Sequence, residues 1–189
     1  MIQNTESSAD DAIQRAAAYE FLGRLWASEV DGDLLAQLLK PSDIHDAFLA
    51  AGGDIQMSAA SVNELAEDYC QLFLGPTNHL PPYQSVWIDG QFAGESSVDM
   101  KKWCELVHFE STAIEPDQLG VQLTVMSRIS ATANVPMESD FFGRHLTWPS
   151  KLIATATQRA RTGFYRSVTK MTAEFLESES ARLLHHGEG

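Results

Sequence analysis

Residues Glu67–Trp87 read EDYCQLFLGPTNHLPPYQSVW. The stretch begins with the apolar spacing of an amphipathic helix, breaks at Gly75-Pro76, and continues as a proline-rich loop that carries Tyr83 and Trp87. Prolines lower the entropy cost of holding a binding shape, and Tyr and Trp are enriched at recognition sites. On physical grounds the loop is a candidate peptide-binding segment, although aromatic residues beside a proline turn usually pack against the body of a fold.

Apolar residues recur at helical spacing over most of the chain, and no run alternates convincingly as a strand would. Two short helices are predicted over 33–39 and 42–51, and Pro116 suits the first position of a longer helix. The patterns predict an all-α fold, a compact multi-helix bundle of roughly eight or nine helices. We expect a single domain over 1–189, as one body or as two small packed lobes, with a hinge around 109–116. The predicted inward faces are Ile13, Ala17, Phe21 and Leu25; Val62, Leu65, Tyr69, Leu72 and Phe73; Val98, Trp103, Leu106 and Val107; Leu119, Leu123, Met126 and Ile129; Phe141, Phe142 and Leu146; and Phe164, Val168, Met171 and Phe175.

The chain is strongly acidic. Its 189 residues include 13 Lys and Arg against 26 Asp and Glu, which gives a formal net charge of −13. Nucleic-acid binding depends on basic side chains that neutralise phosphates, so this class of partner is not expected. An acidic surface attracts cationic partners and speeds their encounter, although the charge could equally serve solubility alone.

The predicted location is the cytoplasm. The N-terminal residues MIQNTESSADDAIQ have neither a basic start nor an apolar run, which argues against a secretory signal peptide. No stretch approaches the ~20 apolar residues of a membrane span, so stable membrane insertion is not expected. Cys70 and Cys104 fall inside predicted helices and outside any C-x-x-C pair, so both are predicted to be small buried residues in a reducing compartment.

No sequence pattern typical of catalysis is present. The six histidines lack the spacing of a metal site, so no metal ligand is predicted. The chain has no G-x-S-x-G elbow, no Walker-type phosphate loop and no dinucleotide-binding glycine pattern. The carboxylates Glu64, Glu67 and Asp68 are predicted to lie on a charged, solvated helix face. No catalytic residue and no cofactor are therefore predicted, and the chain is not expected to be an enzyme.

Several stretches share residues and spacing with one known family. The shared residues are Tyr69, Leu72, Phe73, Gly75 and Pro76; Pro82, Tyr83, Ser85, Val86 and Trp87; Glu115, Pro116, Asp117 and Gly120; His145, Leu146 and Trp148; and Phe164 and Tyr165. With these residues the chain resembles the redox-enzyme maturation chaperones, which include the chaperones of trimethylamine-N-oxide and dimethyl-sulfoxide reductases. The resemblance extends over residues 11–176, in the family's order.

The resemblance implies an all-helical cytoplasmic chaperone without catalytic activity. Its partners would be the twin-arginine leader peptide and the apo-form of a molybdenum-cofactor enzyme, which it would hold until cofactor insertion and then release for export. Tyr83 and Trp87 would line the apolar part of the site, and Ser85 would supply a hydrogen bond or cap the turn. Asp117, beside Gln118, would pair with a peptide arginine. The residues that would shape the loop are Gly75, Pro76 and Pro82.

The chain departs from the family at one position and leaves alternatives open. The family commonly has histidine where this chain has Gln118, which cannot gain charge near neutral pH, so nucleotide binding that rests on this histidine is not carried over. A chaperone of the same fold with a non-exported redox enzyme or metalloenzyme as its client is one alternative. A small helical enzyme that depends on a metal or a nucleotide is another. Both a monomer and a lobe-swapped dimer are compatible with the resemblance.

Overall fold

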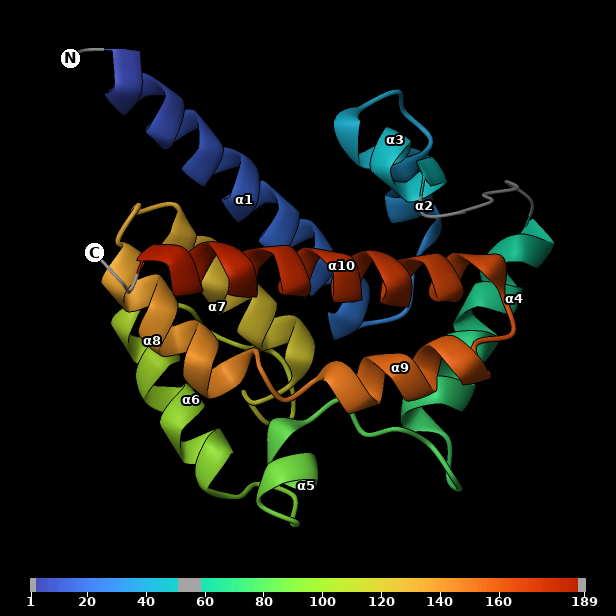
Figure 1. Ribbon diagram of the computed structural model, residues 1–189. Coiled ribbons are helices and arrows are strands. Elements are labelled where there is room, and N and C mark those ends of the chain that lie inside the picture. Colours follow the sequence, from blue (N-terminus) through green and yellow to red (C-terminus); the bar gives the residue numbers. More distant parts are fainter. Residues whose placement is uncertain (1–2, 51–58, 187–189) are drawn as a thin grey trace. The chain divides into compact units, whose positions relative to one another are not determined.

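The computed structural model describes residues 3–50 and 59–186, and these residues form helices joined by short connections (Figure 1). Within this part of the chain there is no strand, only an isolated bridge between Tyr83 and Gln118. The all-α prediction is therefore confirmed. The helices are α1 (Gln3–Ala27), α2 (Gly32–Leu38), α3 (Asp43–Ala50), α4 (Ala59–Tyr69), the π-helix η1 (Cys70–Leu74), α5 (Gln84–Ile88), α6 (Glu95–Leu106), α7 (Leu119–Ser130), α8 (Val135–His145), α9 (Ser150–Arg159) and α10 (Gly163–His186).

The chain divides into two compact units. The first combines the N-terminal segment up to Ala27 with Tyr83–Trp148 and the C-terminal segment from Ser178. The second combines Ser28–Pro82 with Pro149–Glu177. Segment 109–116 lies inside the first unit, so the hinge expected there stays a prediction.

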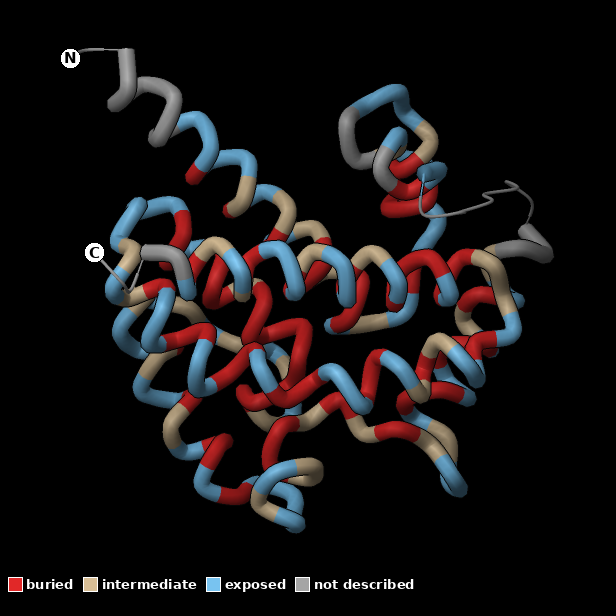
Figure 2. The backbone as a smooth tube through the Cα atoms, in the orientation of Figure 1, coloured by how far each residue is buried: buried red, intermediate tan, exposed pale blue. Residues whose placement is uncertain are grey.

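A close crossing of α1 and α7 forms the core of the first unit. A side chain on Gly120 would lie 2.5 Å from the backbone nitrogen of Ala27, and one on Gly23 would lie 2.5 Å from Thr124 Oγ1. The two glycines therefore let the backbones approach. On α7 the predicted face is confirmed, and Figure 2 shows this helix as mostly buried. Its members Leu119, Leu123, Met126 and Ile129 are all 0% exposed.

The predicted inward face of α1 is right at Leu25, which is buried, and wrong at Ile13 and Ala17. Ile13 is 62% exposed, and the buried face instead follows Ala16 and Tyr19. The reason is tertiary, because Ser127 Oγ donates to the Ala16 carbonyl at 2.7 Å and Tyr19 donates to Glu179 at 3.1 Å. These contacts select a face with small and polar members over one defined by apolar spacing.

The predicted face of α6 is wrong at two of its members, whereas Trp103 is half-buried against Phe141. Val98 and Leu106 are exposed, whereas the small residues Ser96 and Ser97 are buried with Met100 and Cys104. Hydrogen bonds of the two serines to Asp89 and Glu115 turn their side of the helix inward. The helix predicted to begin at Pro116 begins instead at Leu119.

The second unit confirms the predicted stripe of α4 and η1. Leu65, Tyr69, Leu72 and Phe73 are buried, and the Tyr69 ring lies 5.1 Å from that of Phe73. The prediction for the first short helix matches α2, and that for the second matches α3 up to Ala50, since Ala51 lies outside the described residues. Apolar spacing alone missed the short helices α5 and α9.

Two predictions of exposure are wrong. Asp68, expected on a solvated face, is only 2% exposed, because its carboxylate accepts hydrogen bonds from the backbone of Arg161 and Thr162 just before α10. Cys70, expected to be buried, is exposed in η1, while Cys104 is buried as predicted. Neither cysteine forms a disulfide.

Candidate functional site

Two segments far apart in sequence meet in the first unit and bring the predicted peptide-binding residues together. Tyr83 and Gln118 form the isolated antiparallel bridge, and the Gln84 N–H donates to the Asp117 carbonyl at 3.0 Å. The Ser85 N–H then donates to Asp117 Oδ2 at 2.7 Å. The Asp117 carboxylate thus satisfies a free N–H at the start of α5, which explains why this five-residue helix forms here.

The polar members of this group are buried. Ser85 and Asp117 are 0% exposed and Gln118 is 6% exposed. Their side-chain oxygens Ser85 Oγ, Asp117 Oδ1 and Gln118 Oε1 have no hydrogen-bond partner in the described structure. Asp117 therefore lies behind the surface, with one acceptor used by α5 and a second one unused. Unpaired buried acceptors are rare and cost free energy, so they mark a place where a donor can be received.

The aromatic members lie closer to solvent. Tyr83 and Trp87 are half-buried, four positions apart on one side of α5. Ile88 and Phe92 are 60% and 50% exposed, and the Phe92 ring packs edge-on against Tyr83 at 5.1 Å. We call these four residues the α5 apolar surface. Sequence reasoning assigned no role to Ile88, the last residue of α5, or to Phe92, although an apolar residue such as Phe92 inside the polar loop after α5 was an available signal.

Carboxylates lie beside this surface. Burial raises the pKa of the Tyr83 hydroxyl, and so do the negative charges of Asp117 and Glu115, which places both carboxylates near the phenol. Glu115 accepts a hydrogen bond from Ser97 Oγ and forms an ion pair with Lys101 at 3.6 Å. The Lys101 side chain is 59% exposed, so this pair is a weak and exchangeable one.

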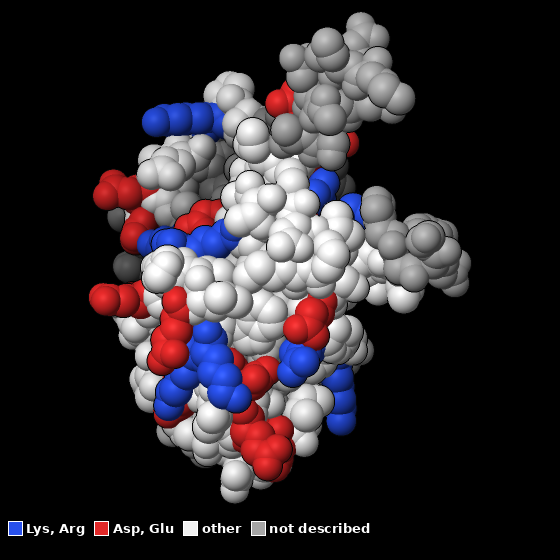
Figure 3. Space-filling model, turned by 90° about the vertical axis from the view of Figure 1, so that its left-hand side faces the viewer, with Lys and Arg blue, Asp and Glu red and all other residues white. Residues whose placement is uncertain are grey.

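Charges of both signs are intermixed on the face shown in Figure 3, where red and blue side chains lie together in the lower part of the view. The ion pairs on α6 and α8 join partly exposed side chains, as the pair between Glu115 and Lys101 does. Asp99 lies 3.6 Å from Lys102 and 3.8 Å from Arg144, and Arg144 also binds Asp140 at 2.8 Å. Some of the carboxylates on these helices are therefore paired with basic side chains.

The residues predicted to shape the loop belong to the second unit. Gly75 ends η1 with an extended backbone, and Leu80 N–H donates back to the Leu72 carbonyl at 2.7 Å. Gly75 and Pro76 line a cleft of about 460 Å³, and Pro82 is buried. A role for these three residues in shaping the loop, and through it in binding, stays a prediction.

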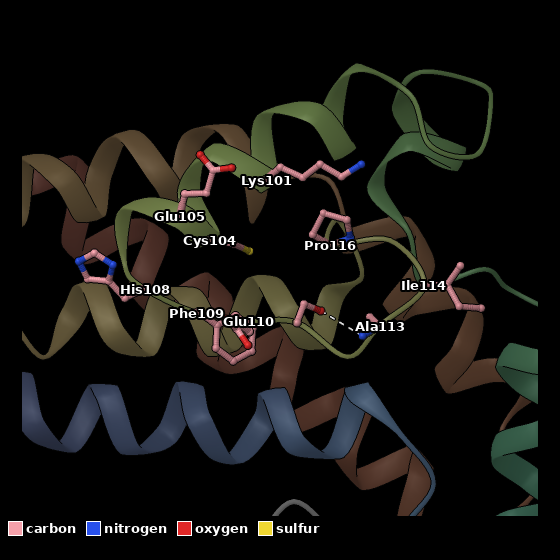
Figure 4. Close-up of a pocket in the computed structure, with 10 residues that line it drawn as sticks. Lys101, Cys104, Glu105, His108, Phe109, Glu110, Ala113, Ile114 and Pro116 are labelled. Carbon is pink, nitrogen blue, oxygen red and sulfur yellow. Dashed lines mark hydrogen bonds between the residues drawn. The ribbon is translucent and has the colours of Figure 1, made fainter.

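A second cleft of about 610 Å³ lies between α6 and the segment that follows it (Figure 4). Lys101, Cys104 and Glu105 extend from α6, while Phe109, Ile114 and Pro116 belong to the following segment. Burial, with a smaller effect of Glu105, raises the pKa of the Cys104 thiol, so it stays protonated and weakly nucleophilic. The cleft therefore offers no activated nucleophile.

Among the described residues, no group of three or more His, Cys, Asp or Glu side chains is placed to hold a metal ion. No helix in residues 3–50 and 59–186 is both long and apolar enough to cross a bilayer.

Comparison with known proteins decides the family. The family model described as nitrate reductase delta subunit matches residues 27–153. The chain belongs to this family. The match includes α5, Asp117 and the whole of α7 and α8. It therefore covers the candidate site.

Three relatives are similar to this chain, two of them over nearly its whole length and one over about two thirds of it. The "Chaperone protein TorD" of Shewanella sp. (strain ANA-3) is 25% identical over 94% of this chain and 97% of its own. The protein of the same name from Colwellia psychrerythraea is 25% identical over 96% of this chain and 97% of its own. The one from Vibrio vulnificus (strain YJ016) is 28% identical over 64% of this chain and 65% of its own. The predicted resemblance to maturation chaperones is confirmed.

Proposed function

We propose that this protein is a cytoplasmic chaperone that binds the twin-arginine leader peptide and the apo-form of a molybdenum-cofactor oxidoreductase before export. Family membership and the chaperone names of the relatives support a maturation role. The same names agree with the prediction that the chain is not an enzyme. The observation that carries leader binding is the α5 apolar surface beside the carboxylates of Glu115 and Asp117.

The apolar half of a leader peptide would pack on Tyr83, Trp87, Ile88 and Phe92. Ile88 and Phe92 expose more than a third of their area to water, although both lie beside half-buried aromatic rings. Burying the exposed part of Ile88 and Phe92 against a partner gains roughly 1–2 kcal/mol each, about half of the value for a fully exposed side chain. Phe92 packed on Tyr83 gives this surface a fixed shape, so little ordering is required.

The two arginines of a leader would bind the carboxylates. Glu115 is the outer acceptor, and a peptide guanidinium would displace Lys101 because it offers two parallel donors where the ammonium offers a point charge. Asp117 is the inner acceptor, since its Oδ1 is unpaired. It is fully buried, so an arginine reaches it only if the neighbouring backbone moves.

Calorimetry with a synthetic twin-arginine leader peptide tests this proposal. Trp87→Ala should weaken binding about tenfold, because a central aromatic anchor is lost. Leu184→Ala is the matched control, since Leu184 is 70% exposed on α10 and should leave affinity unchanged. Equal losses in the two variants, or no binding by the unsubstituted protein, would exclude leader binding at α5.

The inner acceptor requires a gentler substitution than alanine. Asp117→Ala removes the acceptor of the Ser85 N–H and would disturb α5 itself. Asp117→Asn keeps an oxygen for Ser85 while removing the charge. If the asparagine variant binds the leader as tightly as the unsubstituted protein, Asp117 does not receive an arginine.

A further inference from the structure

Four side chains of the first unit form a continuous hydrogen-bonded series that reaches α5, and a fifth side chain, Asp99, lies against its end. The indole of Trp148 donates to Gln122 Oε1 at 2.9 Å, and Gln122 Nε2 donates to Gln84 Oε1 at 2.6 Å. His145 Nδ1 lies 3.0 Å from the same Gln84 oxygen, and its Nε2 lies 3.2 Å from Asp99 Oδ2. These side-chain contacts link α5, α6, α7 and α8.

The indole N–H of Trp148 fixes which group donates in each hydrogen bond from Trp148 to His145. The indole N–H of Trp148 can only donate, so the Gln122 oxygen faces it and the Gln122 amide group faces Gln84. Gln84 must then accept through Oε1. The same orientation of its amide lets Nε2 donate to the Arg144 carbonyl at 2.8 Å. An amide oxygen can only accept. His145 therefore carries its proton on Nδ1.

The other nitrogen of His145 faces a carboxylate. Burial lowers the pKa of His145 to about 4, against the opposing effect of Asp99, so the ring is neutral at neutral pH. The charged groups near it are Asp99 and Lys102 from α6 and Asp140 and Arg144 from α8, while α5 and α7 contribute the neutral amides Gln84 and Gln122. A neutral ring protonated on Nδ1 turns its Nε2 lone pair toward Asp99.

This arrangement acts on α5. Gln84 is the first residue of α5, between Tyr83 and Ser85, and its side chain contacts Arg144, Gln122 and His145. A helix of five residues cannot hold its own conformation in water, so tertiary contacts must position it. Asp117 accepts a hydrogen bond from the backbone of α5. The Gln84 side chain connects the start of α5 to α7 and α8.

We propose that His145 is the positioning residue of the α5 apolar surface, and that it acts by donating its Nδ1–H to Gln84 Oε1. The effect on peptide affinity rests on the proposed function, whereas the effect on α5 itself does not. His145 matches the family's H-L-x-x-W pattern, but Gln84 occupies a variable position in the proline-loop pattern. The contact between them is thus a property of this chain's tertiary structure.

Two substitutions of His145 separate this role from simple packing. The amide nitrogen of asparagine occupies nearly the position of Nδ1 and can still donate to Gln84, whereas that of glutamine reaches the position of Nε2. We expect His145→Asn to retain the amide exchange protection of Val86–Asp89 and the leader affinity within about threefold. His145→Gln should lose about tenfold in both.

Nitrogen NMR of the unsubstituted protein gives an independent readout. At neutral pH the Nδ1 resonance should be that of a protonated nitrogen and the Nε2 resonance that of an unprotonated one. Asp99→Asn offers a donor to the Nε2 lone pair and should leave α5 protection unchanged or raise it, while it would lower protection if the ring were an imidazolium.

The outcomes separate the two proposals. An unprotonated Nδ1, or equal exchange protection in His145→Asn and His145→Gln, overturns the positioning role. If the unsubstituted protein binds no leader peptide but the two variants differ in exchange as expected, the positioning role stands and leader binding fails.

Discussion

His145 gives a prediction about pH at the scale of a single residue. Burial lowers its pKa from 6.5 to about 4 in the folded protein, so between these values the unfolded chain binds more protons. The stabilisation is therefore fully present above the unfolded pKa and is lost as pH falls toward 4, a difference of roughly 3 kcal/mol. Urea unfolding of the unsubstituted protein and of His145→Asn across this range should give free energies whose difference shrinks with falling pH. Parallel profiles would mean that folding does not shift the pKa of His145.

Asp68 gives a second residue-scale prediction, in the second unit. Its carboxylate accepts from Arg161 N at 3.1 Å, from Thr162 N at 2.8 Å and from Thr162 Oγ1 at 2.7 Å. Asp68→Ala leaves these buried donors without a partner, and we expect a loss of about 3 kcal/mol in the free energy of unfolding. Asp68→Asn should lose less because its amide oxygen still accepts.

The neighbouring Glu67 supplies the control for Asp68. It lies exposed on α4, so Glu67→Ala should change the free energy of unfolding by less than about 0.5 kcal/mol. A comparable loss in both alanine variants, measured by urea unfolding, would contradict a specific role for the Asp68 hydrogen bonds.

At the scale of the elements, the crossing of α1 and α7 depends on glycine. A Cβ on Gly120 would lie 2.5 Å from Ala27 N and 2.8 Å from the Gly23 carbonyl, and both are backbone atoms that cannot rotate away. Gly120→Ala should therefore lower the free energy of unfolding by about 1–3 kcal/mol or more. The measurement is thermal or urea unfolding.

Gly143 on α8 is the matched control for this crossing. It is exposed, and a Cβ there would meet no atom within 4 Å. Gly143→Ala should raise stability by about 0.5–1 kcal/mol, because alanine favours a helix interior over glycine. If both substitutions change the free energy of unfolding in the same direction, the close approach of the α1 and α7 backbones does not exclude a side chain at Gly120.

At the scale of the whole molecule, the net charge of −13 predicts how a leader peptide associates. Long-range attraction between an acidic protein and a cationic peptide is screened by salt, so the Kd should rise about tenfold between about 50 mM and about 500 mM salt. A peptide with both arginines replaced by glutamine should show little salt dependence. If the Kd values of the two peptides change equally with salt concentration, the arginines do not contribute to the electrostatic attraction.

The prediction of elements succeeded where burial was nearly complete. Every residue of the α7 stripe is fully buried, so apolar spacing alone identified it. Apolar spacing failed in the N-terminal half of α1, where Ile13 is exposed and Tyr19 is buried, although it identified Leu25 correctly. It failed there because a hydrogen bond from Tyr19 to Glu179, 160 positions away, favours the polar residue inside.

The sequence by itself determined the helical class, the family and the segment Glu67–Trp87 that identifies it, because helical periodicity and motif spacing are local properties of a chain. Only the tertiary structure decided that Asp117 is buried beneath that segment's end and binds Ser85, and that Gln84 joins it to His145. These contacts connect residues 32 and 61 positions apart. They depend on the geometry of buried hydrogen bonds, which apolar spacing does not encode.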